Sequence, residues 1–161
     1  MAESNRKVVL GLGNILNSDE GLGVHALQSL AQTLTSLNHE VEFVDGGVLG
    51  LNLLPLVESC SHLLILDAIN AGLPPGSLLE LRGEDIPLYA EARLSQHQIT
   101  FQETLALAKL RAKLPPHLYL IGVQPADLSI RIGLSSVVAL ALPQVIERTV
   151  EVLRIWGLLE T

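Results

Sequence analysis

The chain is poor in cysteine, in aromatic residues and in positive charge, and each shortage excludes a class of protein. Cys60 is the only cysteine among 161 residues, so an intrachain disulfide framework is impossible and a reducing compartment fits. The formal net charge is −7 and no basic run is present, which argues against binding to nucleic acid or to an anionic membrane. Aromatic residues make up 3% of the chain and hydrophobic residues 48%, so we expect a core of Leu, Val, Ile and Ala.

Long hydrophobic runs are also missing. The longest, over residues 137–142, is bounded by serines and by Pro143, far short of the ~20 residues that cross a bilayer. Residues 1–7 are polar, and the apolar run after them is too short for a signal peptide. We therefore predict a soluble, cytoplasmic protein without a membrane partner. The length predicts a single domain over residues 1–161.

Apolar segments of strand length alternate with segments of helical periodicity. The predicted strands cover residues 8–12, 41–44, 62–66, 77–81 and 118–123. The predicted helices cover residues 20–37, 51–58, 100–113 and 135–156, with Asn17 or Ser18 capping the first and Pro143 kinking or breaking the last. This alternation predicts an α/β fold, a three-layer sandwich in which a mostly parallel, twisted, five-stranded sheet carries helices on both faces.

Four polar residues stand where predicted strands end or helices begin. Glu20 follows the first strand, Asp45 and Asp67 end the second and third, and His97 lies in a polar stretch entering a helix. Because ligands bind at the carboxyl ends of the strands in such sheets, we expect these side chains to converge. Carboxylates with an imidazole suit zinc, nickel or cobalt. The alternatives are a helix-dipole role for Glu20, turn-shaping roles for the aspartates and a plain hydrogen-bonding role for His97.

A glycine-rich turn, Gly11-x-Gly13, follows the first predicted strand and would ordinarily suggest a phosphate cradle. Here Asp19 and Glu20 stand at the start of the helix, where they would repel a pyrophosphate and attract a cation. Leu16 replaces the third glycine of the dinucleotide fingerprint, so a dinucleotide-binding enzyme with Asp45 on the ribose is the weaker interpretation. Structural or surface roles are expected for the other residues of catalytic type: His25, His39, His62, His117 and Cys60.

The motif at the first strand resembles the signature of the nickel–iron hydrogenase maturation endopeptidases. Further matches follow in the same order and extend the resemblance over nearly the whole chain. The matching segments are Gly11-Leu12-Gly13-Asn14-Ile15-Leu16 with Asp19-Glu20-Gly21-Leu22-Gly23, Asp45-Gly46-Gly47, Asp67-Ala68, Ser95-Gln96-His97-Gln98, and Gly122-Val123-Gln124-Pro125 with Gly133-Leu134-Ser135.

The resemblance implies an endopeptidase, classified as aspartic-type, that removes the C-terminal extension of a hydrogenase large-subunit precursor after nickel insertion. It implies that Glu20, Asp67 and His97 contact the metal, and Asp45 joins them in the catalytic set. Nickel is expected to arrive with the substrate, and zinc or cadmium can substitute for it in crystals. The expected partner is the precursor, with no nucleic acid, and the protein is expected to be a monomer.

Two alternatives remain at the level of the sequence. The peptide could be cleaved through a metal-polarised carbonyl or a metal-activated water, with Asp45 as base or orienting group. It could also be cleaved by an aspartic-protease-like pair formed by Asp45 and Asp67. A different function, a non-catalytic nickel-sensing chaperone, would use the same ligands and leave the mass of its partner unchanged.

Overall fold

The computed structural model describes residues 5–35, 39–86 and 96–160, without the side chains of residues 96–100. Its five strands form one sheet in the order β2-β1-β3-β5-β4. All neighbouring strands are parallel except β4, which pairs antiparallel with β5 at one edge. The predicted mostly parallel five-stranded sheet is confirmed, and the strands are β1 (Arg6–Leu12), β2 (Glu42–Gly47), β3 (Cys60–Ala68), β4 (Leu78–Arg82) and β5 (His117–Val123).

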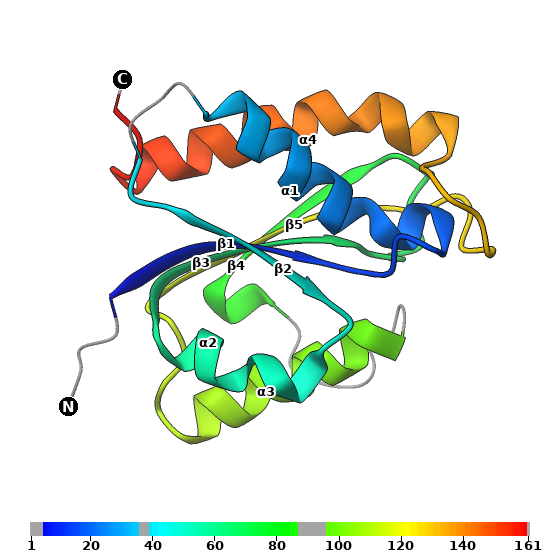
Figure 1. Ribbon diagram of the computed structural model, residues 1–161. Helices are drawn as coiled ribbons and strands as arrows, with labels where there is room; N and C mark the ends of the chain where they lie inside the picture. The colour runs from blue at the N-terminus through cyan, green and yellow to red at the C-terminus, as the bar shows by residue number, and fades with distance from the viewer. Residues whose placement is uncertain (1–4, 36–38, 87–95, 161) are drawn as a thin grey trace.

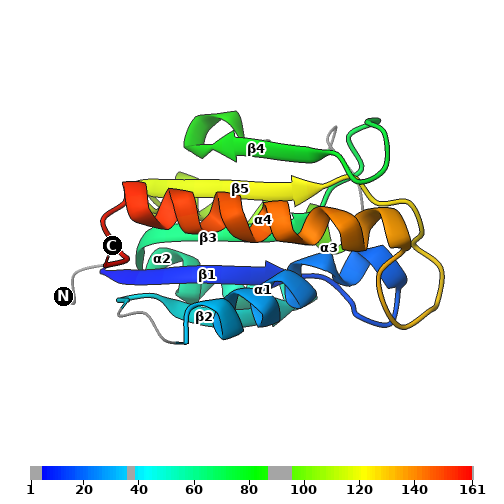
Figure 2. The ribbon, with the colours of Figure 1, turned by 90° about the horizontal axis from the view of Figure 1, so that it is seen from above.

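Helices cover both faces of the sheet, as predicted (Figure 1). Helices α1 (Leu22–Thr33) and α4 (Ser136–Ile155) lie on one face, and α2 (Leu54–Glu58) and α3 (Gln96–Leu110) lie on the other. The parallel strands all end on the right-hand side of Figure 2, and α4 begins on this side and runs back along the sheet. We call this side the carboxyl edge. The described residues also form three short 3₁₀ helices: η1 (Ser18–Gly21), η2 (Gly50–Leu53) and η3 (Gly83–Asp85).

The core lies in two layers, one on each face of the sheet. Val9 and Leu64 belong to the cluster beneath α1 and α4, whereas Leu10 and Ile65, their neighbours along β1 and β3, belong to the cluster over α2 and α3. This is the alternation of side chains that an extended strand imposes. Because both faces are covered, the central strands are apolar at successive positions, which is typical of a buried parallel sheet.

Helix α1 is shorter than the predicted helix over residues 20–37, since it begins at Leu22 after η1 and ends at Thr33. Neither predicted cap is made. The Asn17 side chain donates to the Leu128 carbonyl at 3.3 Å, and the Ser18 hydroxyl donates to the Gly133 carbonyl at 3.1 Å. Contacts with a distant loop thus hold these residues, and the chain makes a 3₁₀ turn before the α-helix begins.

Helix α3 begins at Gln96, before the predicted start at residue 100, and ends at Leu110, before the predicted end at residue 113. Ala112 has a φ of 57°, and the Lys113 amide donates to the Ala108 carbonyl at 2.8 Å. This is a left-handed helix terminus of the Schellman type, which satisfies a carbonyl of the last turn. The helix therefore stops ahead of Pro115 and Pro116.

Helix α4 runs through Pro143 as one continuous helix, so of the predicted kink or break the break does not occur. Val138 and Ala141 before the proline and Val145 after it are buried in the same core cluster. Packing on both sides of the proline offsets the loss of its backbone donor. None of the helices in the described part of the chain has the length and apolar content needed to cross a membrane.

The other predicted boundaries differ by small amounts. The predicted helix over residues 51–58 is η2 followed by α2, with Pro55 in the first turn of α2, where a proline is tolerated. The third strand extends beyond the predicted residues 62–66 at both ends. Residues 87–95, between η3 and α3, lie outside the described residues.

Candidate functional site at the carboxyl edge

The strands β1 and β3 are neighbours, and the chain leaves them in opposite directions. It runs from β1 through α1 to β2 on one side, and the segments after β3 form β4 and β5 on the other. Open α/β sheets bind their ligands at such a switch point, outside the carboxyl ends of the strands. Glu20 follows β1 within η1, and Asp67 lies near the end of β3. The structure thus brings these two predicted site residues to the ends of adjacent strands.

Glycines allow the segment after β1 to close tightly over the strand ends. A side chain on Gly23 would overlap the carbonyl oxygens of Leu66 and Leu12, and one on Gly13, whose φ is 124°, would overlap the Glu20 carbonyl. The start of α1 therefore rests directly against the backbone of β1 and β3.

Asp19 is an internal anchor. Its side chain is fully buried, and its Oδ2 accepts hydrogen bonds from the amides of Ala126 and Asp127 at 2.9 Å and from the Ser135 hydroxyl at 2.8 Å. Its Oδ1 accepts from the Ser135 amide at 2.7 Å. The expectation that both acids of the turn attract a cation is therefore wrong for Asp19, because its oxygens hold the loop between β5 and α4. Glu20 is the acid of this pair that remains a candidate for the site.

The two acids at the ends of β1 and β3, Glu20 and Asp67, differ in how deeply they are buried. Glu20 is partly buried, whereas Asp67 is only 3% exposed. One oxygen of Asp67, Oδ1, accepts a hydrogen bond from the Ala68 amide at 2.8 Å, which fixes its carboxylate at the strand end. The register places Asp67 opposite Gly122 of β5. Both acids lie at the carboxyl edge, and Asp67 is the deeper of the two.

Asp45 lies at the same edge, on the strand beyond β1. It is exposed, and the register places it beside Gly11. Its Oδ1 accepts from the Gly47 amide at 2.9 Å, and Gly47 has a φ of 49°, which glycine adopts without strain. The predicted turn-shaping role of Asp45 is thus present in the structure.

His97 is the second residue of α3, and this helix begins on the right-hand side of Figure 1, the side on which β1, β2, β3 and β5 end. Its side chain is outside the described residues, so its direction is not tested. Within the described part of the chain, no three His, Cys, Asp or Glu side chains are grouped as a metal site would require. The two carboxylates and one imidazole remain a chemically suitable donor set for a borderline divalent ion.

Gln124 is a second structural residue that sequence analysis did not distinguish. It is buried just after β5, and its Oε1 accepts from the amides of Ala71 at 2.7 Å and Leu73 at 3.2 Å. Its Nε2 donates to the Asn70 side chain at 3.1 Å. A buried glutamine with its amide satisfied in this way holds the loop after β3 in place. The Gln-Pro motif therefore positions the loop that follows Asp67.

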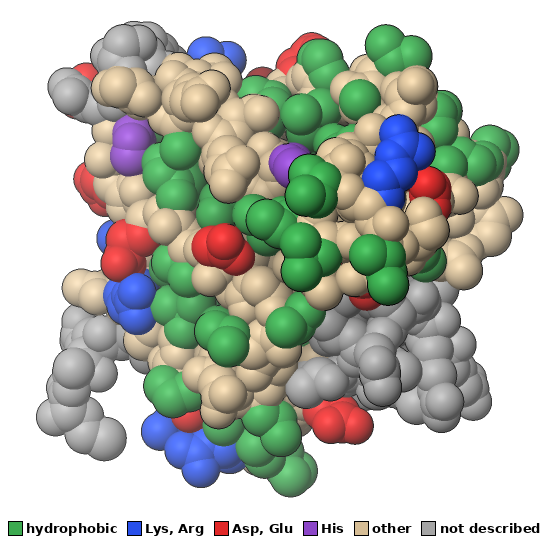
Figure 3. All heavy atoms as spheres, turned by 45° about the vertical axis from the view of Figure 1, so that its right-hand side comes forward, with side chains coloured by type: hydrophobic (Ala, Val, Ile, Leu, Met, Phe, Trp, Pro, Cys, Tyr) green, Lys and Arg blue, Asp and Glu red, His purple; other side chains and the backbone are tan. Residues whose placement is uncertain are grey.

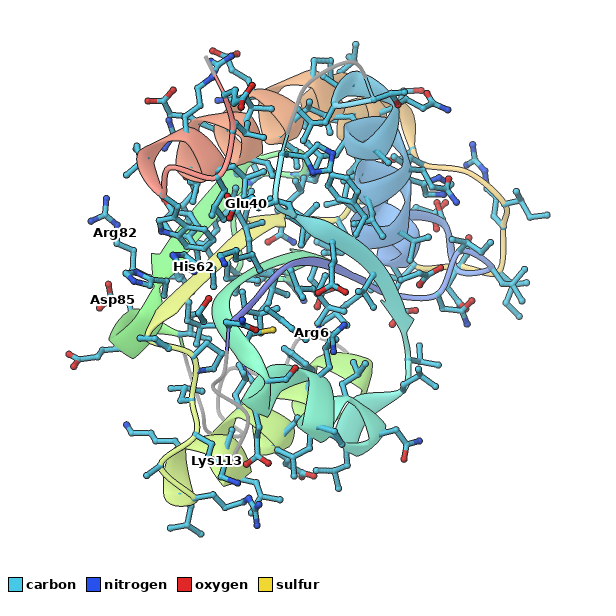
Figure 4. The ribbon with its side chains drawn as sticks, turned by 60° about the vertical axis from the view of Figure 1, so that its left-hand side comes forward. Arg6, Glu40, His62, Arg82, Asp85 and Lys113 are labelled. Carbon is cyan, nitrogen blue, oxygen red and sulfur yellow. The ribbon has the colours of Figure 1, made fainter. Side chains whose placement is uncertain are left out.

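The amino edge of the sheet, opposite the site, carries a separate group of rings. Figure 4 brings this edge forward and labels His62, whose ring stacks on that of His117 with centroids 4.2 Å apart and meets the Trp156 ring edge-on. Burial, followed by the neighbouring His117, lowers the pKa of His62. Cys60, on the same strand, is 1% exposed, and burial raises its pKa to about 11. These are structural roles, as predicted.

Comparisons with known proteins agree with this arrangement. The family model described as HycI, hydrogenase maturation protease, matches residues 24–152. The hydrogenase 2 maturation protease of Escherichia coli K12 is 35% identical over 150 residues, which are 92% of this chain and 91% of that protein. The hydrogenase expression/formation protein HupD of Rhodobacter capsulatus is 39% identical over 155 residues, 95% of this chain and 73% of that protein. The solved hydrogenase maturating endopeptidase HybD from E. coli has a TM-score of 0.86 and 34% identity, covering 96% of this chain and 98% of that one.

Proposed function

The chain belongs to the hydrogenase maturation protease family and is a peptidase, and on this basis we propose that it cleaves the C-terminal extension from a nickel–iron hydrogenase large-subunit precursor. We propose further that the nickel is part of the substrate and that the protein acts as a single-domain monomer. The observation that carries the proposal is the placement of Glu20 and Asp67 at the ends of β1 and β3, where such sheets bind ligands.

In this proposal, Glu20, Asp67 and His97 contact the nickel that the precursor carries. Two carboxylates and an imidazole leave coordination positions for ligands supplied by the substrate. The contact would place the C-terminal extension of a nickel-loaded precursor at the carboxyl edge. A metal-free precursor would lack this anchor. Zinc and cadmium accept the same donors and should occupy the same position in soaked crystals.

Asp45 is the proposed base or orienting group for hydrolysis. It is exposed at the same edge, and only its Oδ1 is used by the Gly47 amide in the turn. A carboxylate can accept a proton from the attacking water as that water adds to the scissile carbonyl. The proton then passes to the departing amine, and one peptide bond is exchanged for one carboxyl and one amino group. The pair Asp45 and Asp67 is the alternative catalytic arrangement.

The test is intact-mass analysis of a nickel-loaded precursor and of the same precursor without metal, each incubated with this protein. We expect the loaded precursor to lose the mass of its extension and the empty one to stay unchanged, even when nickel is added to the protease beforehand. Cleavage of both would contradict the role of nickel and leave the peptidase activity. An unchanged mass with stable binding of the loaded precursor would instead support the nickel-sensing chaperone.

Three variants test the site residues in the same assay. Glu20→Gln, Asp67→Asn and His97→Ala should each abolish cleavage while circular dichroism shows a native fold. Because Asp67 is buried, the isosteric asparagine is the appropriate replacement, and its thermal midpoint should be measured alongside. Full activity in any one of these variants would remove that residue from the proposed site.

A further inference from the structure

Exposed apolar side chains are concentrated at the carboxyl edge. Within the described residues, only Leu107, Leu110, Leu140 and Ile155 among the large exposed hydrophobic side chains lie elsewhere. Figure 3 brings the carboxyl edge forward and shows hydrophobic side chains across it with few charged ones between them. The main group, which we call the apolar rim, comes from the segments after β1, β2 and β5 and consists of Leu16, Val48, Leu49, Leu128, Ile130 and Ile132.

Two side chains of the rim are almost fully exposed to solvent. Ile130 is 90% exposed and Ile132 is 80% exposed, so neither packs against the protein. Transferring such surface from water to an apolar contact is favourable. Large exposed apolar patches on folded proteins mark sites of interaction with other macromolecules.

The backbone that carries the apolar rim is held firmly in place. The Arg131 amide, between the two isoleucines, donates to the Leu16 carbonyl at 2.9 Å, and the Ser18 amide donates to the Arg131 carbonyl at 2.8 Å. The Asp19 carboxylate holds both ends of the same loop. On the other side, the Gly13 amide donates to the Gly47 carbonyl at 2.9 Å and connects the segments after β1 and β2. The apolar side chains are thus presented by an ordered backbone.

The apolar rim is continuous with the candidate site. Leu16 precedes Glu20 in the same segment, and Val48 follows Asp45 in the turn after β2. Asp67 is the last residue but one of β3. This strand lies between β1 and β5, whose following loops carry Leu16 and Ile130. A macromolecule whose peptide is bound at this edge therefore lies next to the rim.

We propose that the apolar rim docks an apolar face of the folded body of the precursor, beside the extension that is cut. This inference rests on the proposed function. The rim is built from the loops after three strands and lies beside the candidate site, so the body to which the extension is attached can contact it while the extension is bound. A second copy of this chain on the rim would close the edge that carries Glu20 and Asp45 to any protein substrate.

The experiment compares two double variants of equal chemistry. Ile130→Ser with Ile132→Ser removes the most exposed part of the rim. Leu110→Ser with Ile155→Ser removes side chains that are 84% and 70% exposed at the ends of α3 and α4, away from the carboxyl edge. Neither double variant should change Tm, because the replaced side chains make little contact with the protein.

With nickel-loaded precursor, the rim variant should show a KM raised about tenfold or more and an unchanged kcat, and the control should match the wild type. The dissociation constant of the uncut precursor should rise by the same factor. An unchanged KM and Kd in the rim variant, with normal cleavage by the wild type, would overturn the docking surface and leave the proposed function intact. Weakened binding by the rim variant with no cleavage by any form would retain the docking surface and reject the proposed function.

Sedimentation equilibrium tests whether a second copy of this chain, instead of the precursor, covers the rim. The wild-type chain should sediment as a monomer at micromolar concentration. A dimer that the Ile130→Ser, Ile132→Ser variant dissociates, and the control does not, would show that a second copy occupies the rim, and this would overturn the proposal.

Discussion

Replacing Asp19 with asparagine should destabilise the protein by about 4 kcal/mol, although the side chain keeps its shape. The carboxylate is fully buried and accepts four hydrogen bonds, three on Oδ2 and one on Oδ1. Each joins η1 to the loop that connects β5 with α4. The anchor therefore couples the candidate site to the apolar rim.

The expected loss of stability follows from how many hydrogen bonds of the Asp19 carboxylate an asparagine amide can still form. An asparagine with its oxygen at the Oδ2 position keeps three bonds, but neutral acceptors form weaker bonds than a carboxylate, with a loss of roughly 1 kcal/mol each. Its NH₂ group then faces the Ser135 amide, which donates at 2.7 Å in the native protein. Two buried donors directed at each other leave both unsatisfied, and the lower end of this cost, about 1 kcal/mol, brings the total to about 4 kcal/mol.

Thermal and urea unfolding measure the effect. A loss of about 4 kcal/mol corresponds to a fall in Tm of roughly 8–16 °C for a domain of this size. Asp127→Asn is the matched control in the same loop. Its carboxylate is partly exposed, accepts a hydrogen bond from the Ser129 amide at 2.9 Å and forms a 3.5 Å pair with Arg131. An asparagine keeps the acceptor for Ser129 and loses only the surface pair, so the midpoint should stay nearly unchanged.

A free energy of unfolding within 1 kcal/mol of the wild type would refute the reasoning for Asp19. It would mean that the cost of burying the carboxylate cancels its four hydrogen bonds. If the reasoning holds, the asparagine variant should also lose affinity for the precursor at temperatures where it is still folded, because the loop that carries Ile130 and Ile132 is no longer held at both ends.

Three further predictions concern packing and titration. Gly23→Ala should yield an unstable or insoluble chain, since the added methyl would overlap the Leu66 carbonyl, and expression with thermal unfolding decides this. Stability should fall as the pH drops below about 6.5, because the lowered pKa of His62 means that the unfolded chain binds the proton more readily. His62→Gln should weaken that pH dependence, and an unaltered profile would exclude the stacked pair with His117 as its source. Cys60 should not react with thiol reagents at neutral pH until the protein unfolds, because its thiol is buried with a pKa of about 11.

Much of the fold could be predicted from the sequence because the hydrophobic pattern is strong. Every strand was placed in the correct region, and the alternation with helices indicated a mostly parallel sheet covered on both faces. The errors lie at helix ends, where distant partners decide the outcome. Ser18 illustrates this, since its hydroxyl reaches Gly133 instead of capping the helix beside it. Local propensity cannot anticipate a bond to a residue so far along the chain.

For the candidate site, too, the sequence predicts the location of the residues but not the contacts that distant segments make with them. Strand ends converge in any parallel sheet, so the sequence could predict that Glu20, Asp45 and Asp67 lie at one edge. It could not distinguish Glu20 from its neighbour Asp19. Both are acids in the same turn, and only the return of the loop after β5 assigns four hydrogen bonds to Asp19.

By itself, the sequence determined the fold class, the order of the elements and the family, because periodicity and motif spacing are properties of the chain. The tertiary structure decided which polar groups are structural. Asp19 and Gln124 hold loops, while Glu20 lies beside the switch point of the sheet. It also gathered isolated leucines and isoleucines from separate loops into the apolar rim. The physical reason is that burial and hydrogen bonding depend on which segments meet in space, and for these loops the partners are far apart in the sequence.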